Sequence, residues 1–425
     1  MPAHRFFSGP ILLASFLSLS ASLFAFHNPL PPQSAPPAGS AHVRAAPLPA
    51  ERESGRENYV GDTTCLSCHE AIEATYLHTA HHLTSQLPSE NSIAGKFTAG
   101  SNTLRTYDPN LHFTMTAQAG SFYQTAVFWQ PPDEQKQTAR IDIVVGSGQR
   151  GQSYLDWKGD RLYQLPVSYW TPLSEWVNSP GYADGTADFD RPVVPRCLEC
   201  HATYFSSIPS SPPENRYRKP GFVLGISCER CHGPGRQHVA EERSRSARLH
   251  QPPADASSHS SVAENLNVVN PAKLPRDREI EVCAQCHAGL GQELAPAFSF
   301  VPGRSLADFL ELPRPGPDAK VDVHGNQVAL FERSRCFQSS PGFTCVTCHD
   351  VHARELEPAS YSARCLGCHQ PENCGLYPKL GQEIVKGCID CHMPVQESDV
   401  IVSNVGGKQV KMQIRNHWIK VYATR

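Results

Sequence analysis

Seven copies of one pattern, Cys-x-x-Cys-His, are the residues whose types and spacing point most directly to chemistry. The two thiols of such a pattern lie about one helical turn apart, and the histidine that follows projects beside them. Thiols in this position add to the two vinyl groups of a haem while the histidine binds its iron, so the pattern is the attachment signal for haem c. In chain order, as motifs 1 to 7, the cysteines are Cys65 and Cys68, Cys197 and Cys200, Cys228 and Cys231, Cys283 and Cys286, Cys345 and Cys348, Cys365 and Cys368, and Cys388 and Cys391. The proximal histidines are His69, His201, His232, His287, His349, His369 and His392.

Zinc sites and redox-active dithiols also use Cys-x-x-Cys pairs. A zinc site needs further ligands to complete about four, and a thioredoxin-like dithiol occurs once, near a βαβ pattern. Seven pairs that are each followed directly by histidine fit neither arrangement. The sequence therefore predicts seven covalently attached haem c groups.

Ten further histidines lie outside the motifs and downstream of the N-terminal segment, and they are candidates for the second axial position of each iron. Ligation by two histidines gives lower reduction potentials than ligation by methionine and histidine. The favoured distal candidates are His78, His81, His82, His238, His324, His352 and His417. The disfavoured ones are His250 and His259, in a Ser/Pro/Ala-rich stretch, and His112, on an expected strand; Met115 and Met412 are weaker options.

Local spacing supports several of these candidates. His78 and His82 are four residues apart on an expected helix, so they share one face. His352 follows the proximal His349 by three residues and lies on the same side of that porphyrin, so we expect it to ligate a neighbouring haem. His417 lies beyond motif 7 in a tail that reads as a loop, and we expect it to fold back onto an earlier haem.

The gap between motifs 1 and 2 contains the clearest strand patterns. The segments Leu111–Ala117 and Ser121–Gln130 flank Gly120 as a hairpin, and Ala139–Val145 ends at Gly146. Ser153–Trp157 and Arg161–Leu165 form a second expected hairpin. We expect a small antiparallel insert over about residues 95–170.

The remaining sequence is rich in chain breakers, with 37 Pro and 29 Gly. The predicted fold is mainly α with extensive loops and a haem-packed core, in which residues 58–190 hold motif 1 and the insert and residues 191–425 hold a six-haem cluster. Porphyrins would supply much of the buried apolar surface, so apoprotein is expected to be largely unfolded. Cys336 and Cys374 lie outside the motifs and are interpreted as a disulfide, as free thiols or, least favoured, as an iron ligand.

The N-terminus predicts export. Residues 11–26 form an uncharged apolar run within a segment, 1–26, that reads as a signal peptide or a retained anchor, and the anchor would tether the protein to a membrane. Residues 27–57 read as a Pro-rich linker. The formal charge of −3 does not suggest nucleic-acid binding. Haem propionates would make the holoprotein more acidic, which favours a positively charged redox partner.

Several stretches resemble the exported multihaem c-type cytochromes, and within them the group related to the tetrahaem cytochrome of ammonia oxidisers. They are YVGDTTCLSCH, GSGQRGQSYLDWKGDRLYQLPVSYW, RPVVPRCLECHATYF, GISCERCHGPGRQHV, NPAKLPRDREIEVCAQCH, SRCFQSSPGFTCVTCHDVH and KGCIDCHMP. The resemblance implies haem c, mainly bis-histidine ligation and electron transfer in the periplasm or at the cell surface. Redox partner proteins would be a membrane quinol dehydrogenase or another cytochrome.

Two functions from different classes fit these patterns, beside a blander structural role within a larger surface complex. The first is an electron carrier with closely spaced haems. The second is a multihaem oxidoreductase in which one open-site haem acts on hydroxylamine or a small nitrogen or sulfur oxyanion. We favour the carrier, because there are enough histidines to fill every axial site and no Cys-x-x-Cys-Lys motif occurs.

Overall fold

The computed structural model describes residues 55–212, 214–249, 268–314, 316, 321–322, 326–354 and 357–422. Glu53–Arg425 forms one compact unit, which contains both expected regions, 58–190 and 191–425. The expected signal or anchor and nearly all of the expected linker lie outside the described residues. Among the residues that are described, no helix is long and apolar enough to span a membrane.

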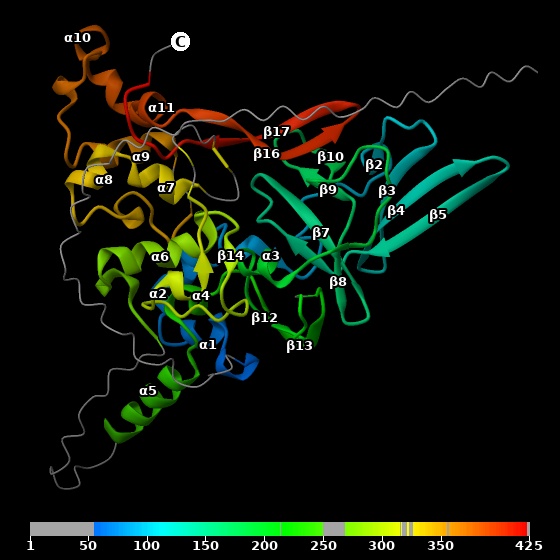
Figure 1. Ribbon diagram of the computed structural model, residues 1–425, viewed down its shortest axis with the longest axis horizontal. Coiled ribbons are helices and arrows are strands. Elements are labelled where there is room, and N and C mark those ends of the chain that lie inside the picture. The colour runs from blue at the N-terminus through cyan, green and yellow to red at the C-terminus, as the bar shows by residue number, and fades with distance from the viewer. Residues whose placement is uncertain are drawn as a thin grey trace, which may run out of the picture. The chain divides into compact units, whose positions relative to one another are not determined.

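The chain is not mainly α, which corrects the predicted fold class. Within the described ranges, strands β1 to β17 accompany helices α1 to α11, and most of the helices are short. Figure 1 shows the strands of the insert to one side and helices α6 to α9 to the other. A glycine directly follows helices such as Cys228–His232 and Tyr377–Leu380, and each motif needs only about one helical turn.

Strands near the middle of the chain form two antiparallel sheets. One has the order β1-β6-β7-β8-β11, with β9 pairing with both β7 and β10, and the other has the order β2-β3-β4-β5. Their bounds are β1 Ser85–Gln86, β2 Thr103–Arg105, β3 Leu111–Gln118, β4 Ser121–Gln130, β5 Asp133–Arg140, β6 Ile143–Val145, β7 Gly151–Lys158, β8 Arg161–Gln164, β9 Val167–Trp170, β10 Glu175–Asn178 and β11 Arg191–Pro192. The strands therefore extend beyond the expected 95–170 in both directions.

The hairpin of β3 and β4 forms as predicted, with Gly120 at a positive φ of 74° in its turn. Alternate residues of both strands are buried, because successive side chains of a strand point to opposite faces. The expected strand Ala139–Val145 is divided, since β5 ends at Arg140 and β6 begins at Ile143. Buried side chains of these sheets, including Met115, Tyr154 and Trp176, form an apolar core made of protein side chains.

Among the residues that the structure describes, three further hairpins lie outside the insert. They are β12 Ala202–Ser207 with β13 Tyr217–Leu224, β14 Gln292–Glu293 with β15 Leu310–Glu311, and β16 Val395–Val405 with β17 Lys408–Arg415. The last one corrects the expectation of a loop-like tail. Gly406 and Gly407 both have positive φ, at 55° and 75°, and form the tight turn that joins its strands.

The helices carry the motifs. Those that contain or end in a motif are α1 Asp62–Leu66, α3 Pro195–Glu199, α4 Cys228–His232, α6 Arg276–His287, α9 Pro358–Cys365 and α11 Cys388–His392, and motif 5 begins a 3₁₀ turn, Cys345–Thr347. The others are α2 Glu70–Tyr76, α5 Arg236–Leu249, α7 Gln327–Glu332, α8 Arg335–Ser339 and α10 Tyr377–Leu380. In α4 the Ser227 hydroxyl accepts a hydrogen bond from the Glu229 amide and caps the turn that presents the motif.

Candidate functional site

One large cavity contains all seven motifs. Its volume is about 4090 Å³, and every motif cysteine and every proximal histidine lines it. Shared among seven motifs it provides about 580 Å³ each, within the roughly 300–1,000 Å³ of a single ligand pocket. The volume and its lining therefore suit several large ligands side by side.

Thiol contacts show which motifs are neighbours. The thiol of Cys65 in motif 1 lies beside that of Cys228 in motif 3. The thiol of Cys200 in motif 2 lies in the same way beside that of Cys286 in motif 4. A third such contact joins motif 4 to motif 5 through Cys283 and Cys345. In a haem-loaded protein these sulfurs would be thioethers, so the cysteines that are neighbours would hold neighbouring haems.

Three distal candidates face proximal histidines of other motifs. The ring centres of His81 and His287 are 6.1 Å apart, those of His352 and His232 are 6.1 Å apart, and those of His417 and His349 are 6.3 Å apart. Two imidazoles that bind one metal from opposite sides, at about 2 Å per bond, have ring centres about 6 Å apart. The pairs thus have the spacing that irons of motifs 3, 4 and 5 require. His352 faces motif 3 rather than its own motif 5.

Hydrogen bonds orient several of these rings. The Nδ1 atoms of His232, His392 and His417 lie 2.8 Å, 2.9 Å and 3.1 Å from the carbonyl oxygens of Val269, Lys420 and Arg415, respectively. A ring that donates from Nδ1 to a carbonyl keeps the lone pair of Nε2 for a metal. The backbone therefore selects the tautomer that iron ligation needs.

Burial keeps the central imidazoles neutral. It lowers the pKa of His287 to about 4, with neighbouring His81, His417 and His349 adding to the effect. The pKa of His417 is also lowered to about 4, chiefly by burial and then by His349. Neutral imidazole is the form that ligates a metal, so both rings are ready to bind iron at pH 7.

The other distal candidates are placed differently. His238, on α5, lines the cavity. His82 does not line it, and its Nδ1 lies 3.1 Å from a carboxylate oxygen of Asp62. His78 is exposed and also lies outside the cavity lining. His324, His250 and His259 lie outside the described residues. His112 is on β3 away from the cavity, Met115 is buried in the sheet core, and Met412 lines the cavity.

The two cysteines outside the motifs also line the cavity. Each is a free thiol in the structure. Cys336 lies near Cys348 and Cys368, at motifs 5 and 6, and Cys374 lies near Cys388 of motif 7. Their surroundings are therefore the last three motifs, and the interpretation as a disulfide stays a prediction.

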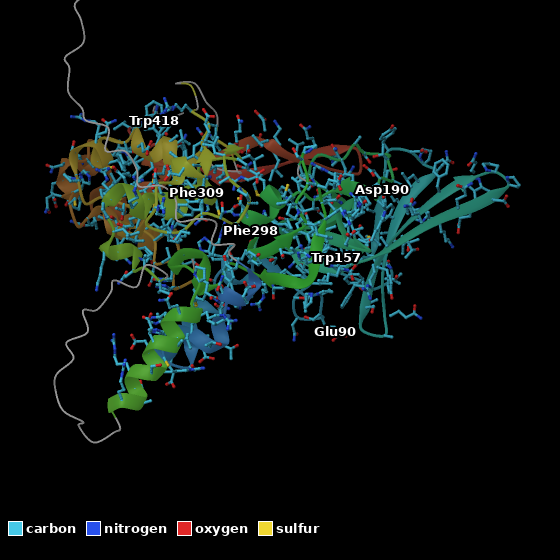
Figure 2. All side chains as sticks on the ribbon, turned by 60° about the horizontal axis from the view of Figure 1, so that its bottom comes forward. Glu90, Trp157, Asp190, Phe298, Phe309 and Trp418 are labelled. Carbon is cyan, nitrogen blue, oxygen red and sulfur yellow. The ribbon has the colours of Figure 1, made fainter. Side chains whose placement is uncertain are left out.

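A buried ionic cluster was missed by sequence reasoning. Glu199, at a variable position of motif 2, accepts a bond of 2.9 Å from Arg196 and lies 3.7 Å from Arg230, a variable residue of motif 3. All three side chains are buried. Phe298, between helices and strands in Figure 2, donates its amide to Glu199 and packs under Arg230. The sequence signal that could have revealed this cluster is the presence of charged residues between the cysteines of motifs 2 and 3.

Comparison with known proteins identifies two similarities. The family described as "Cytochrome c554 and c-prime" matches residues 178–233, which include motifs 2 and 3. The solved structure titled "Crystal Structure of Outer Cell Wall Cytochrome OcwA" is similar with a TM-score of 0.49 and 17% identity, over 85% of this chain and 80% of that chain. No curated protein matches. The family match and the repeated motifs support a multihaem c-type cytochrome that binds haem covalently and transfers electrons.

Proposed function

We propose that the chain is a seven-haem c-type cytochrome that transfers electrons outside the cytoplasm through closely spaced, mostly bis-histidine haems. The observation that carries this proposal is the single cavity, which brings all seven motifs together. Three histidine pairs with ring centres about 6 Å apart would each hold one haem iron, at motifs 3, 4 and 5. A bound haem would supply a one-electron Fe(II)/Fe(III) couple.

The protein's own residues would perform four tasks in this function. The motif cysteines would hold each porphyrin edge covalently. Carbonyl oxygens orient the imidazoles, as Val269 does for His232. Cavity walls exclude water, which reduces the solvent reorganisation that accompanies a change of charge. Arginines such as Arg354 and Arg364 line the cavity and would pair with propionates.

The test is a haem count combined with a spin-state count on purified holoprotein. The intact mass after denaturation should exceed that of the processed polypeptide by seven haems. Electron paramagnetic resonance should show low-spin signals for at least the haems of motifs 3, 4 and 5. A mass that corresponds to fewer haems would contradict the proposed number of seven. A majority of high-spin haems would contradict the proposed function as an electron carrier.

The place of action is part of the same proposal. The expected export segment supports a location in the periplasm or at the cell surface, with a membrane quinol dehydrogenase or another cytochrome as electron donor or acceptor. Fractionation of cells that make the full chain, followed by haem staining, tests this. Haem-stained protein confined to the cytoplasm would contradict it.

A second candidate function is an oxidoreductase with one open-site haem. It is favoured by Arg150 and Arg191, which line the cavity wall formed by the sheet together with Ser153 and Tyr169. Cationic and hydroxyl groups of this kind stabilise small oxyanions. Addition of nitrite or hydroxylamine to the holoprotein should then shift the Soret band and abolish a high-spin signal. Unchanged spectra and only low-spin haem would exclude this function.

A further inference from the structure

Carboxylates surround the junction between motifs 1 and 3. The Cys228 amide donates to Asp62 over 3.0 Å, and Asp62 lies in the helix turn that carries Cys65. The Glu229 carboxylate accepts bonds of 2.8–2.9 Å from the amides of Val60, Gly61 and Gly235. Glu229 is buried, and both carboxylates act electrostatically on Cys65. The Glu229 carboxylate is held by backbone amides, and Asp62 faces the Nδ1 of His82 at 3.1 Å. Two carboxylates against at most one imidazolium leave this junction negative.

Guanidinium groups surround the junction between motifs 2 and 4. Arg196 donates to the carbonyl oxygens of Gln285, Gly289 and Leu290 over 2.8–3.3 Å. Arg230 donates to the carbonyl oxygen of Glu199, which the Cys286 thiol also approaches at 3.7 Å. The exposed fractions of Arg196 and Arg230 are only 8% and 6%. A second carboxylate, Glu293, also acts on Arg196 and Glu199 but is only partly buried. The fully buried charges beside this junction are two guanidinium groups and one carboxylate, so their sum is positive.

The negative and the positive junction change the reduction potential of a nearby haem in opposite directions. Ferric haem carries one more positive charge than ferrous haem, so a nearby carboxylate stabilises the oxidised state and lowers the potential. A nearby guanidinium stabilises the reduced state and raises it. Because Coulomb energies grow as the effective dielectric falls, buried charges act more strongly than exposed ones.

We propose that the buried side chains of Asp62, Glu229, Arg196 and Arg230 hold the motif 1 haem at a lower potential than the motif 2 haem, so that electrons run from motif 1 to motif 2. In the step, one electron leaves the Fe(II) of motif 1 and reduces the Fe(III) of motif 2. The route passes through motifs 3 and 4, whose Cys231 and Cys283 are neighbours. This inference rests on the proposed haem complement and assigns the carrier a direction.

The experiment is a potentiometric titration of holoprotein followed by visible spectroscopy. Each haem gives one redox wave, which is one step of the titration curve. His69→Met and His201→Met identify the waves of motifs 1 and 2, because methionine ligation raises the reduction potential of the haem concerned and so moves its wave. Asp62→Asn and Glu229→Gln, which keep a hydrogen-bond acceptor, should each raise the motif 1 wave. Arg230→Gln should lower the motif 2 wave. The expected change in the reduction equilibrium is about tenfold, which is about 59 mV for one electron.

Two control variants distinguish an effect of side-chain charge on the potentials from an effect of altered structure. Arg230→Lys keeps the charge and should leave the motif 2 wave near its original potential, whereas a purely structural role would shift it as Arg230→Gln does. Asp190→Asn removes an exposed carboxylate that does not line the cavity and should shift neither wave. The proposal is wrong if the motif 1 wave lies above the motif 2 wave, or if the marked waves do not move as stated. A haem count below seven in the same preparations would instead indicate failure of the proposed function.

Discussion

His417 illustrates how residues that bind no metal position an axial ligand. Its carbonyl oxygen accepts a bond of 3.3 Å from the Ser334 hydroxyl, which in turn accepts one of 2.8 Å from the Ile419 amide. Ser334 is fully buried, so these bonds face no competition from water. They fix the tail at the point where the ring meets His349.

Replacement of His417 by alanine should convert one haem from low spin to high spin. The loss removes the second nitrogen ligand proposed for the motif 5 iron, while the cysteines and His349 keep the haem attached. Resonance Raman and electron paramagnetic resonance would measure the change as about one seventh of the total haem. The matched control is His112→Ala, on β3 outside the cavity lining. Its fraction of high-spin haem should equal that of the wild-type protein. An unchanged spin state in the His417 variant would contradict the assignment.

Asp156, on β7, should make stability depend on pH. Burial, together with repulsion by Asp142, raises the pKa of Asp156 to about 6. Because the folded state binds this proton more tightly than the unfolded state, Asp156 adds to the free energy of unfolding below about pH 4. This contribution is lost as the pH rises to about 6 and does not change further above it.

The variant Asp156→Asn should remove this dependence. At pH 7 it should be more stable than wild type by about 1–3 kcal/mol, and at pH 4 the two should be equal. Urea unfolding followed by far-UV circular dichroism at both pH values measures the difference. Asp190→Asn, at an exposed side chain, serves as the control. A stabilisation of equal size at both pH values would show that ionisation of Asp156 is not its cause.

At the scale of elements, the two sheets of the insert are packed around Trp176 of β10. Its indole donates to the carbonyl oxygens of Lys96 and Ser101 over 3.0 Å and 3.1 Å. Phe97, Tyr154 and Tyr169 pack against the ring. Gly95 lies so close that a Cβ atom there would meet the ring itself.

Gly95→Ala should therefore destabilise the insert by about 1–3 kcal/mol, the typical cost of overpacking a core. Urea unfolding would measure the loss. Gly342→Ala is the control, because a Cβ atom at Gly342 meets nothing within 4 Å. The haem count should be unaffected, since Gly95 does not line the cavity. Equal stability of the two variants would show that the ring can shift without cost.

At the scale of the whole molecule, the two kinds of core have different origins. The sheets bury their own aromatic and aliphatic side chains. The motif helices instead surround the cavity, whose volume porphyrins would fill. Of these helices, α6 also packs into a separate apolar cluster with Phe300 and Leu306. The expectation that apoprotein is largely unfolded therefore applies to the motif helices more than to the insert.

Apoprotein made without haem attachment should keep strand structure and lose helical structure. The physical reason is that apolar burial stabilises the sheets directly, whereas the short motif helices have little propensity to form alone. Far-UV circular dichroism and hydrogen exchange of β3 and β4 would measure this. Native-like protection of α4 and α11 in apoprotein would contradict it, and holoprotein provides the reference.

The strands that could be predicted were those with local signals. Residues 111–130 alternate clearly around Gly120, so their hairpin was predictable. The last hairpin was missed although Gly406 and Gly407 mark its turn, because Val395–Val405 alternates poorly. The ionic cluster around Glu199 was missed because its members come from separate motifs.

The covalent chemistry of this protein is determined by its sequence alone, because haem attachment needs only residues within five positions of one another. The choice of facing imidazoles was decided by the tertiary structure. His81, His352 and His417 each meet a histidine of another motif, while His82 turns to Asp62. Such pairings depend on long-range packing of helices, sheets and tail, which no local spacing encodes.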